Sequence, residues 1–181
     1  MFSLDDIRRY IRKYQPDGLI VDTNILILFL VGSYDINQIE KLKVLNNSDK
    51  KYSIDDFKLL KELFEYFKKI IIIPQVIAEL SNLSITGGGV NGNKLNDYLQ
   101  IVIKFLKRAE ERHQQTNCLW GMELSVIGKY GFTDMTLFEL SKQTKMQILT
   151  DEMPLYVYSQ NKIPIIKFGH IKNQAFQNVF S

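Results

Sequence analysis

The sequence predicts an α/β fold, namely a three-layer α/β/α sandwich around a central, mainly parallel sheet of four or five strands. Short, fully apolar runs alternate along the chain with longer segments in which apolar residues recur at helical spacing. Strands without polar alternation are typical of parallel sheets, which helices cover on both faces. The alternation of strands and helices therefore indicates one sheet buried between two helical layers.

The length and composition are those of one ordinary globular domain. The chain has 181 residues, 45% hydrophobic and 24% charged, which suits a single domain over 1–181. Its one cysteine, Cys118, excludes an internal disulfide, and no apolar run is long enough to span a bilayer. We therefore expect a cytoplasmic protein with no membrane contact. The formal net charge of +3 is compatible with nucleic-acid binding without indicating it.

The first half of the chain predicts helices and two buried strands. Turn chemistry at Gln15–Gly18 ends the first helix, and a capping pattern of Ser53 and Asp56 begins a later one. Pro74 closes the second strand and is well placed to begin a helix. The expected elements are helix 4–15, strand 18–21, helix 25–31, polar loop 32–52 with a turn at 46–49, a helix from Ser53 to 67, strand 70–73 and helix 75–83.

The second half continues the alternation. A flexible glycine-rich loop precedes a helix with a long apolar stripe, and Thr133 is placed to cap another helix. Trp120 is expected in the core. The expected elements are loop 87–93, a helix from Leu95 to about 112, a short helix 122–130, helix 134–144, strand 147–150, helix 155–160, strand 164–168 and a loosely packed tail from Gly169.

Acidic residues stand at four stations that share one topological position. Asp22 and the Asp151–Glu152 pair directly follow strands, Glu79 lies in the first turns after a strand, and Asp134 opens a helix. In a parallel sheet these points fall on the carboxyl edge, where such folds bind ligands. Carboxylates gathered there repel one another unless cations neutralise them, and ligand sets made only of oxygen suit Mg²⁺ or Mn²⁺. Taken singly, two of these acids are explained as well by a structural role at a helix end as by a role in a metal site. These are Asp134, which follows Thr133, and Glu79, which lies in the first turn of a helix.

The segments around these acids resemble the four motifs of the PIN-domain family. Each motif alone is weakly specific, but here the four occur in the family's order, across roughly residues 17–168. The resemblance implies divalent-metal-dependent cleavage of RNA, with Asp22 as the central metal ligand and Glu79 and Asp134 beside it. Thr23, Asn24 and Thr150 are then expected to orient Asp22 or to contact the substrate. The matching segments are 19–26, 73–80, 134–141 and 148–155.

The fourth motif departs from the family pattern. The family's acid falls two residues after the motif's Thr, which is Glu152 here, while Asp151 fills the variable position. Either acid could therefore complete the catalytic and metal-binding set. Two long segments, 32–68 and 84–118, also exceed what a minimal PIN domain carries.

The leading hypothesis is an endoribonuclease that acts on single-stranded RNA, as a housekeeping enzyme or as the toxin of a toxin–antitoxin pair. The resemblance is compatible with a protein antitoxin and with a homodimer. Two alternatives stay open: a non-catalytic RNA-binding or scaffold protein on a degenerate PIN fold, and a structure-specific DNA nuclease.

The first helix interleaves basic and aromatic side chains, which could grip an RNA strand through phosphate contacts and stacking. A solvated basic face on an amphipathic helix explains the same pattern and is the favoured interpretation. The residues concerned are Arg8, Arg9, Tyr10, Arg12, Lys13 and Tyr14.

Overall fold

The protein forms a layered arrangement of short strands and longer helices, and a computed structural model describes residues 4–41, 51–83, 90 and 92–174. The elements are α1 (Leu4–Tyr14), β1 (Leu19–Val21), α2 (Thr23–Tyr34), the 3₁₀ helix η1 (Ile36–Gln38), α3 (Ile54–Phe67), β2 (Ile70–Ile72), α4 (Pro74–Ser81), η3 (Gly92–Lys94), α5 (Leu95–Leu106), β3 (Glu110–Glu111), η4 (Thr116–Leu119), α6 (Leu124–Thr144), β4 (Gln147–Thr150), α7 (Met153–Ser159), β5 (Ile165–Lys167) and α8 (Phe168–Gln174).

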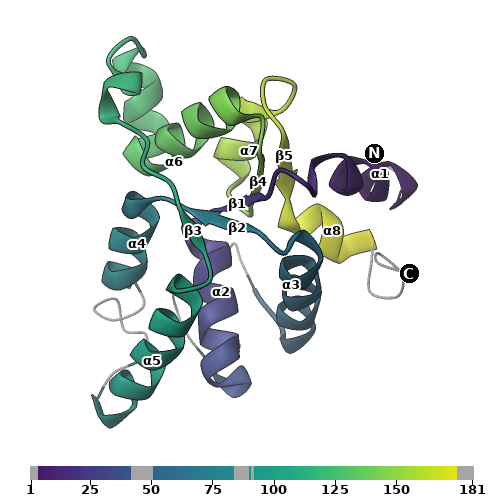
Figure 1. Cartoon of the computed structure of the whole chain (residues 1–181), viewed down its shortest axis with the longest axis vertical. Helices are drawn as coiled ribbons and strands as arrows, with labels where there is room; N and C mark the ends of the chain where they lie inside the picture. Colours follow the sequence, from purple (N-terminus) through teal and green to yellow (C-terminus); the bar gives the residue numbers. More distant parts are fainter. Residues whose placement is uncertain (1–3, 42–50, 84–89, 91, 175–181) are drawn as a thin grey trace.

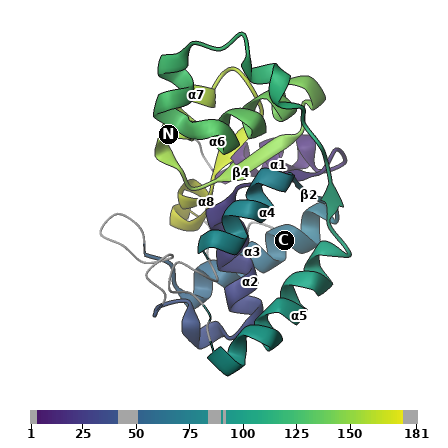
Figure 2. The ribbon, with the colours of Figure 1, turned by 90° about the vertical axis from the view of Figure 1, so that its left-hand side faces the viewer.

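The five strands form one sheet in the order β3-β2-β1-β4-β5, and every pair is parallel. Helices α2, α3, α4 and α5 lie on one side of the sheet, and α6 and α7 lie on the other (Figures 1 and 2). The predicted α/β/α architecture is confirmed. The chain moves outward from β1 to β3 and then returns to place β4 on the other side of β1. This switch point between β1 and β4 is where open α/β sheets form their ligand crevice.

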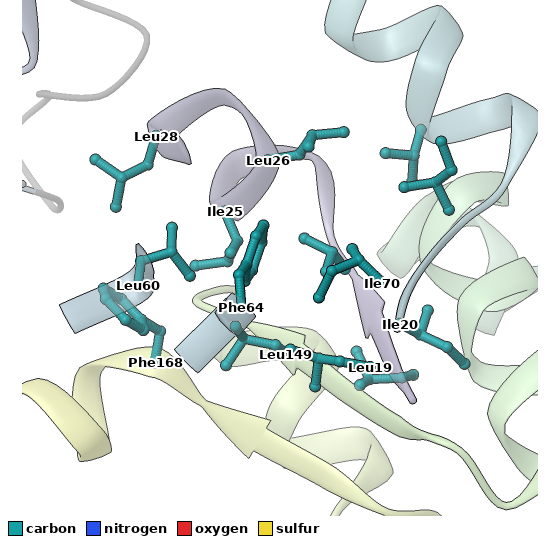
Figure 3. Close-up of a cluster of buried hydrophobic side chains, with 14 of the residues drawn as sticks. Leu19, Ile20, Ile25, Leu26, Leu28, Leu60, Phe64, Ile70, Leu149 and Phe168 are labelled. Carbon is teal, nitrogen blue, oxygen red and sulfur yellow. The ribbon is translucent and has the colours of Figure 1, made fainter. Parts of the chain in front are cut away.

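Helix α2 is the centre of the core on its side of the sheet. It packs against α3, α4 and α5 as well as the sheet, so it has almost no solvent-facing side. Figure 3 shows side chains of α2 meeting those of β1, β2, β4, α3 and α8. A helix surrounded in this way needs apolar residues on all sides, which explains the unbroken run from Ile25 to Val31.

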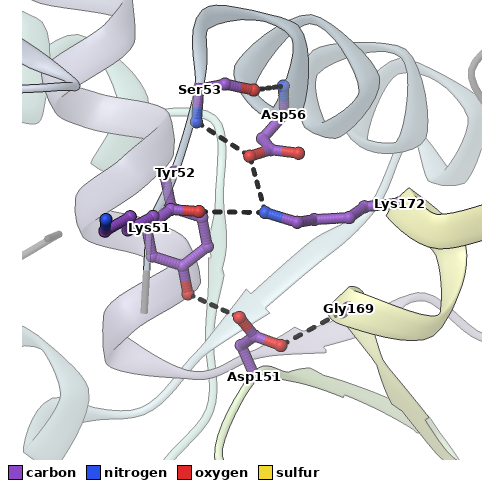
Figure 4. A network of polar contacts seen from close by, with 7 residues as sticks. All are labelled: Lys51, Tyr52, Ser53, Asp56, Asp151, Gly169 and Lys172. Carbon is purple, nitrogen blue, oxygen red and sulfur yellow. Dashed lines mark hydrogen bonds and ion pairs between the residues drawn. The ribbon is translucent and has the colours of Figure 1, made fainter. Parts of the chain in front are cut away.

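Helix α3 begins with the capping box that the sequence predicts. The Ser53 hydroxyl accepts a hydrogen bond from the Asp56 amide at 3.2 Å, and the Asp56 carboxylate accepts one from the Ser53 amide at 2.8 Å. The ammonium of Lys172 on α8 lies 2.9 Å from the same carboxylate (Figure 4). The N-terminus of α3 is therefore tied to the last helix of the chain.

The region around residue 110 differs from the prediction. The helix that starts at Leu95 ends at Leu106 rather than near 112, and Glu110 and Glu111 form the edge strand β3. Two glutamates at a partly exposed edge carry no apolar run, so the pattern gave no sign of a strand.

The C-terminal tail and Trp120 also differ from the prediction. The segment after β5 forms α8, with Ile171 fully buried. Trp120, expected in the core, is 84% exposed. Because Trp120 belongs to no periodic apolar pattern, the sequence does not indicate whether its side chain points to the core or to solvent. It lies just after η4 among other exposed side chains.

In α6, Gly131 adopts a positive φ of 84° and separates two helical parts. The predicted helices 122–130 and 134–144 correspond to these parts, but Thr133 lies inside the second part and does not cap it. The predicted turn at 46–49 and most of the glycine-rich loop at 87–93 lie outside the described residues. None of the helices in the described ranges has the length and apolarity needed to cross a membrane.

Candidate acidic site at the carboxyl edge of the sheet

Asp22 lies at the switch point, between the end of β1 and the start of α2. Its amide donates to the Leu149 carbonyl of β4 at 3.1 Å, which fixes its backbone against the neighbouring strand. Asp22 is 3% exposed, and its carboxylate accepts hydrogen bonds from the Thr23 amide at 2.6 Å and from the Thr150 hydroxyl at 2.7 Å. As the N-cap of α2, this carboxylate also faces the positive end of the helix dipole. The side chain is therefore held by the first residue of α2 and the last residue of β4.

Glu79 reaches the same place from α4. It accepts a hydrogen bond from the Thr23 hydroxyl at 2.6 Å and another from the Thr133 hydroxyl at 3.0 Å. Thr23 thus donates its amide to Asp22 and its hydroxyl to Glu79. The two acids are separated by 57 positions in the sequence, yet they share one residue at the start of α2.

Glu152 joins this group from the carboxyl end of β4. Its backbone amide donates to the Thr150 hydroxyl at 2.9 Å, and its carboxylate accepts a short hydrogen bond from the side-chain amide of Asn24. Thr150 therefore bridges Asp22 and Glu152. Asp22, Glu79 and Glu152, the three acids that we call the acidic site, meet around the first two residues of α2.

Asp151 makes its hydrogen bonds with a different part of the fold. Its carboxylate accepts hydrogen bonds from the Tyr52 hydroxyl and from the Gly169 amide, both at 3.0 Å (Figure 4). Consecutive residues of an extended segment direct their side chains to opposite sides, which explains why Asp151 and Glu152 diverge. Between the two acids that the sequence left open, Glu152 is the one that contacts the residues around Asp22.

Asp134 is half-buried one residue after Thr133, whose hydroxyl contacts Glu79. This places the backbone of Asp134 beside α4.

The donor chemistry of the acidic site suits a hard divalent cation, because all its acidic side chains offer oxygen atoms. Within the described ranges, however, no three or more His, Cys, Asp or Glu side chains are arranged so that they could hold a metal ion. Hydroxyl and amide donors of Thr23, Asn24, Thr133 and Thr150 instead occupy carboxylate oxygens. A cation would compete with these donors for the same lone pairs.

Tyr52 is a neighbour of the acidic site that the sequence analysis did not identify. Burial, followed by the negative charges of Asp151, Asp22 and Glu152, raises the pKa of Tyr52 far above its ordinary value. The phenol therefore stays protonated at neutral pH and remains a hydrogen-bond donor to Asp151. An apolar side chain just before the Ser53 cap commonly packs against the helix, which could have predicted its burial but not its contact with Asp151.

We expect Tyr52→Phe to lower the free energy of unfolding by about 1–3 kcal/mol, because Asp151 loses one of its two hydrogen-bond donors. Urea denaturation followed by circular dichroism measures the change. Tyr34→Phe is the matched control, since the Tyr34 hydroxyl has no hydrogen-bond partner among the described residues, and it should change stability by less than about 0.5 kcal/mol. Equal effects of the two substitutions would show that the Tyr52–Asp151 contact contributes nothing.

No protein-family model, curated protein or solved structure matches this chain.

Proposed function

We propose that the protein is a divalent-metal-dependent endoribonuclease that cleaves single-stranded RNA. The observation that supports this most is the buried Asp22 at the switch point, joined through Thr23 to Glu79 and through Thr150 to Glu152. Acids from three distant segments converge on one end of α2, at the sheet edge where α/β proteins bind their ligands. Three of the four acidic motifs of the sequence, those of Asp22, Glu79 and Glu152, contribute to this group.

In this proposal, Asp22, Glu79 and Glu152 would hold a Mg²⁺ or Mn²⁺ ion once their carboxylates give up some of the hydrogen bonds that they accept in this structure. Such an ion, when bound, supplies activation of water and neutralisation of phosphate charge. Thr150 and the Thr23 amide keep the Asp22 carboxylate in a fixed orientation, and Asn24 does the same for Glu152.

A second candidate function is RNA binding without cleavage. It is favoured by the lack, among the residues that the structure describes, of three acids already arranged to hold an ion. In this alternative, the hydroxyl and amide donors stay hydrogen-bonded to the carboxylates and no ion replaces them. The acidic site then stabilises the fold at the junction of β1, β4 and α2.

Metal-dependent cleavage tests the proposal. We expect the protein to cut single-stranded RNA in the presence of MnCl₂, to leave 5′-phosphate and 3′-hydroxyl ends, and to lose at least about 99% of the rate in excess EDTA because the carboxylates alone cannot activate water. A time course on labelled RNA, separated on denaturing gels, measures this.

Three outcomes would contradict the proposal. RNA that is bound but stays intact over a wide range of Mn²⁺ concentrations would favour the non-catalytic alternative. Preferential cutting of a flapped DNA would indicate a DNA nuclease, and undiminished cleavage in EDTA would exclude metal dependence. A cytoplasmic toxin with a protein antitoxin is the cellular role that we propose for such an activity, and a small neighbouring reading frame would support it.

A further inference from the structure

A cavity of about 610 Å³ lies between α1 and the outer edge of the sheet at β5. Its walls come from α1, the C-cap of α6, the chain from α7 through β5, and the first turn of α8. The volume falls in the range of sites for small molecules and cofactors, roughly 300–1,000 Å³. Asp22, Glu79 and Glu152 do not line it, so the cavity is separate from the acidic site.

Aromatic rings line the cavity from two sides. Tyr10 and Tyr14 of α1 form an edge-to-face pair with ring centroids 5.0 Å apart, and Tyr156 of α7 forms another with His170 of α8 at 5.0 Å. The Ile165 amide of β5 donates to the Tyr10 hydroxyl at 3.1 Å, which fixes that ring against the sheet. A ring in edge-to-face contact still has a face on which a planar group can stack.

His170 acts in the cavity as a neutral aromatic ring. Burial and the charge of Lys167 lower the pKa of His170, while Asp151 opposes this shift. The imidazole is therefore uncharged at neutral pH, and it adds aromatic surface without adding charge.

Lysine side chains supply the positive charge of the cavity. Lys13, Lys145, Lys162 and Lys167 line it, whereas Asp6 is the one acidic residue among the described residues of the lining. In this structure the ammonium of Lys162 lies 3.6 Å from the centroid of the Tyr158 ring, and that of Lys167 lies 3.7 Å from the Met153 sulfur, both contacts with residues that do not line the cavity. Aromatic walls with a surplus of lysines complement a ligand that carries both a planar ring and an anionic group.

We propose that the cavity between α1 and β5 binds a nucleotide. Its base stacks among Tyr10, Tyr14, Tyr156 and His170, and its phosphate faces the lysines. This inference does not rest on the proposed ribonuclease activity, because the cavity shares no lining residue with the acidic site. The nucleotide is either a free nucleoside monophosphate or one residue of an RNA strand.

Calorimetric titration of the full chain in EDTA tests this proposal without any contribution from metal-dependent cleavage. The probes are UMP, AMP, uridine, ribose 5-phosphate and a six-residue oligouridylate. We expect UMP or AMP to bind with a dissociation constant below about 1 mM. Uridine and ribose 5-phosphate should each bind at least about tenfold more weakly, because each lacks one of the two recognised groups.

Substitutions within the cavity provide the second part of the test. Tyr14→Ala should weaken nucleotide binding about tenfold by removing a stacking surface. Lys162→Glu should weaken it by roughly the same factor by opposing the phosphate charge. Lys61→Glu on α3 is the matched control, since it makes the same charge change at an exposed position outside the cavity and should leave binding unchanged. Thermal melting of each variant checks that it folds.

The outcomes separate the two sources and can overturn the proposal. A hexanucleotide that binds more than tenfold tighter than UMP, with the same sensitivity to Lys162→Glu, identifies an RNA strand, whereas equal affinities identify the free nucleotide. The absence of binding by every phosphate-bearing probe at millimolar concentration would overturn the proposal. An equal loss in Lys61→Glu, or binding of uridine as tight as that of UMP, would overturn it as well.

Discussion

Replacing Asp22 with asparagine is expected to lower the rate of RNA cleavage by about a thousandfold or more while the fold is retained. Asp22 is the one acid of the site that is almost fully buried, and it contacts both Thr23 and Thr150. In the proposed mechanism it is the central ligand of the metal ion. Asparagine removes the negative charge that would attract the ion and replaces one oxygen with a nitrogen that cannot coordinate it.

The same substitution should preserve the local structure. The remaining carboxamide oxygen can still accept the hydrogen bond from the Thr23 amide, and asparagine is a good N-cap residue for α2. The Thr150 hydroxyl can rotate to accept from the new amide, because a hydroxyl is both donor and acceptor. Loss of activity would therefore reflect lost chemistry and not an unfolded protein.

Single-turnover cleavage of labelled RNA in Mn²⁺, together with thermal melting, measures both effects. Asp35→Asn is the matched control, because Asp35 caps the opposite end of the same helix and lies outside the acidic site. It should cleave at the wild-type rate. Full activity of Asp22→Asn would rule out the proposed role of this carboxylate, and a metal titration of both variants would show whether the loss arises from weakened metal binding.

Replacing Leu26 with alanine is expected to lower the free energy of unfolding by about 2–5 kcal/mol. Leu26 is fully buried in α2, and Figure 3 shows it within the cluster formed by α2, the sheet and neighbouring helices. Its removal leaves a space that surrounding elements cannot fill, because α2 packs against α3, α4 and α5 at once. Small domains are stable by only about 5–15 kcal/mol, so this is a large fraction of the total.

The change should appear as a decrease in Tm of about 5–15 °C. Leu124→Ala is the matched control, since Leu124 is 85% exposed and the same truncation there should change stability by less than about 0.5 kcal/mol. Similar Tm values for the two variants would mean that α2 is not the rigid centre of this layer. At temperatures where Leu26→Ala stays folded, its cleavage rate should remain close to that of the wild type.

The fold could largely be predicted because its signals are local. The four predicted strands all occur, and the β4 boundaries agree at Gln147–Thr150. A parallel sheet buried on both faces needs short apolar runs, and the capping box of α3 involves residues three positions apart. The strand β3 was not predicted, because Glu110 and Glu111 have no apolar side chains that would indicate a strand. Their extended conformation depends on pairing with β2 at the edge of the sheet.

The sequence by itself determined which acids stand at strand ends, and therefore that a carboxylate-rich edge was to be expected. Only the tertiary structure decided how those acids are used. It turns Glu152 toward Asn24 and Asp151 toward Tyr52, contacts that join residues 128 and 99 positions apart. The physical reason is that a carboxylate's charge follows from its residue type, whereas its hydrogen-bond donors come from whichever distant segments the fold brings beside it. The cavity at β5 likewise exists only because α1 packs along the last strand, and no local pattern in either segment specifies that contact.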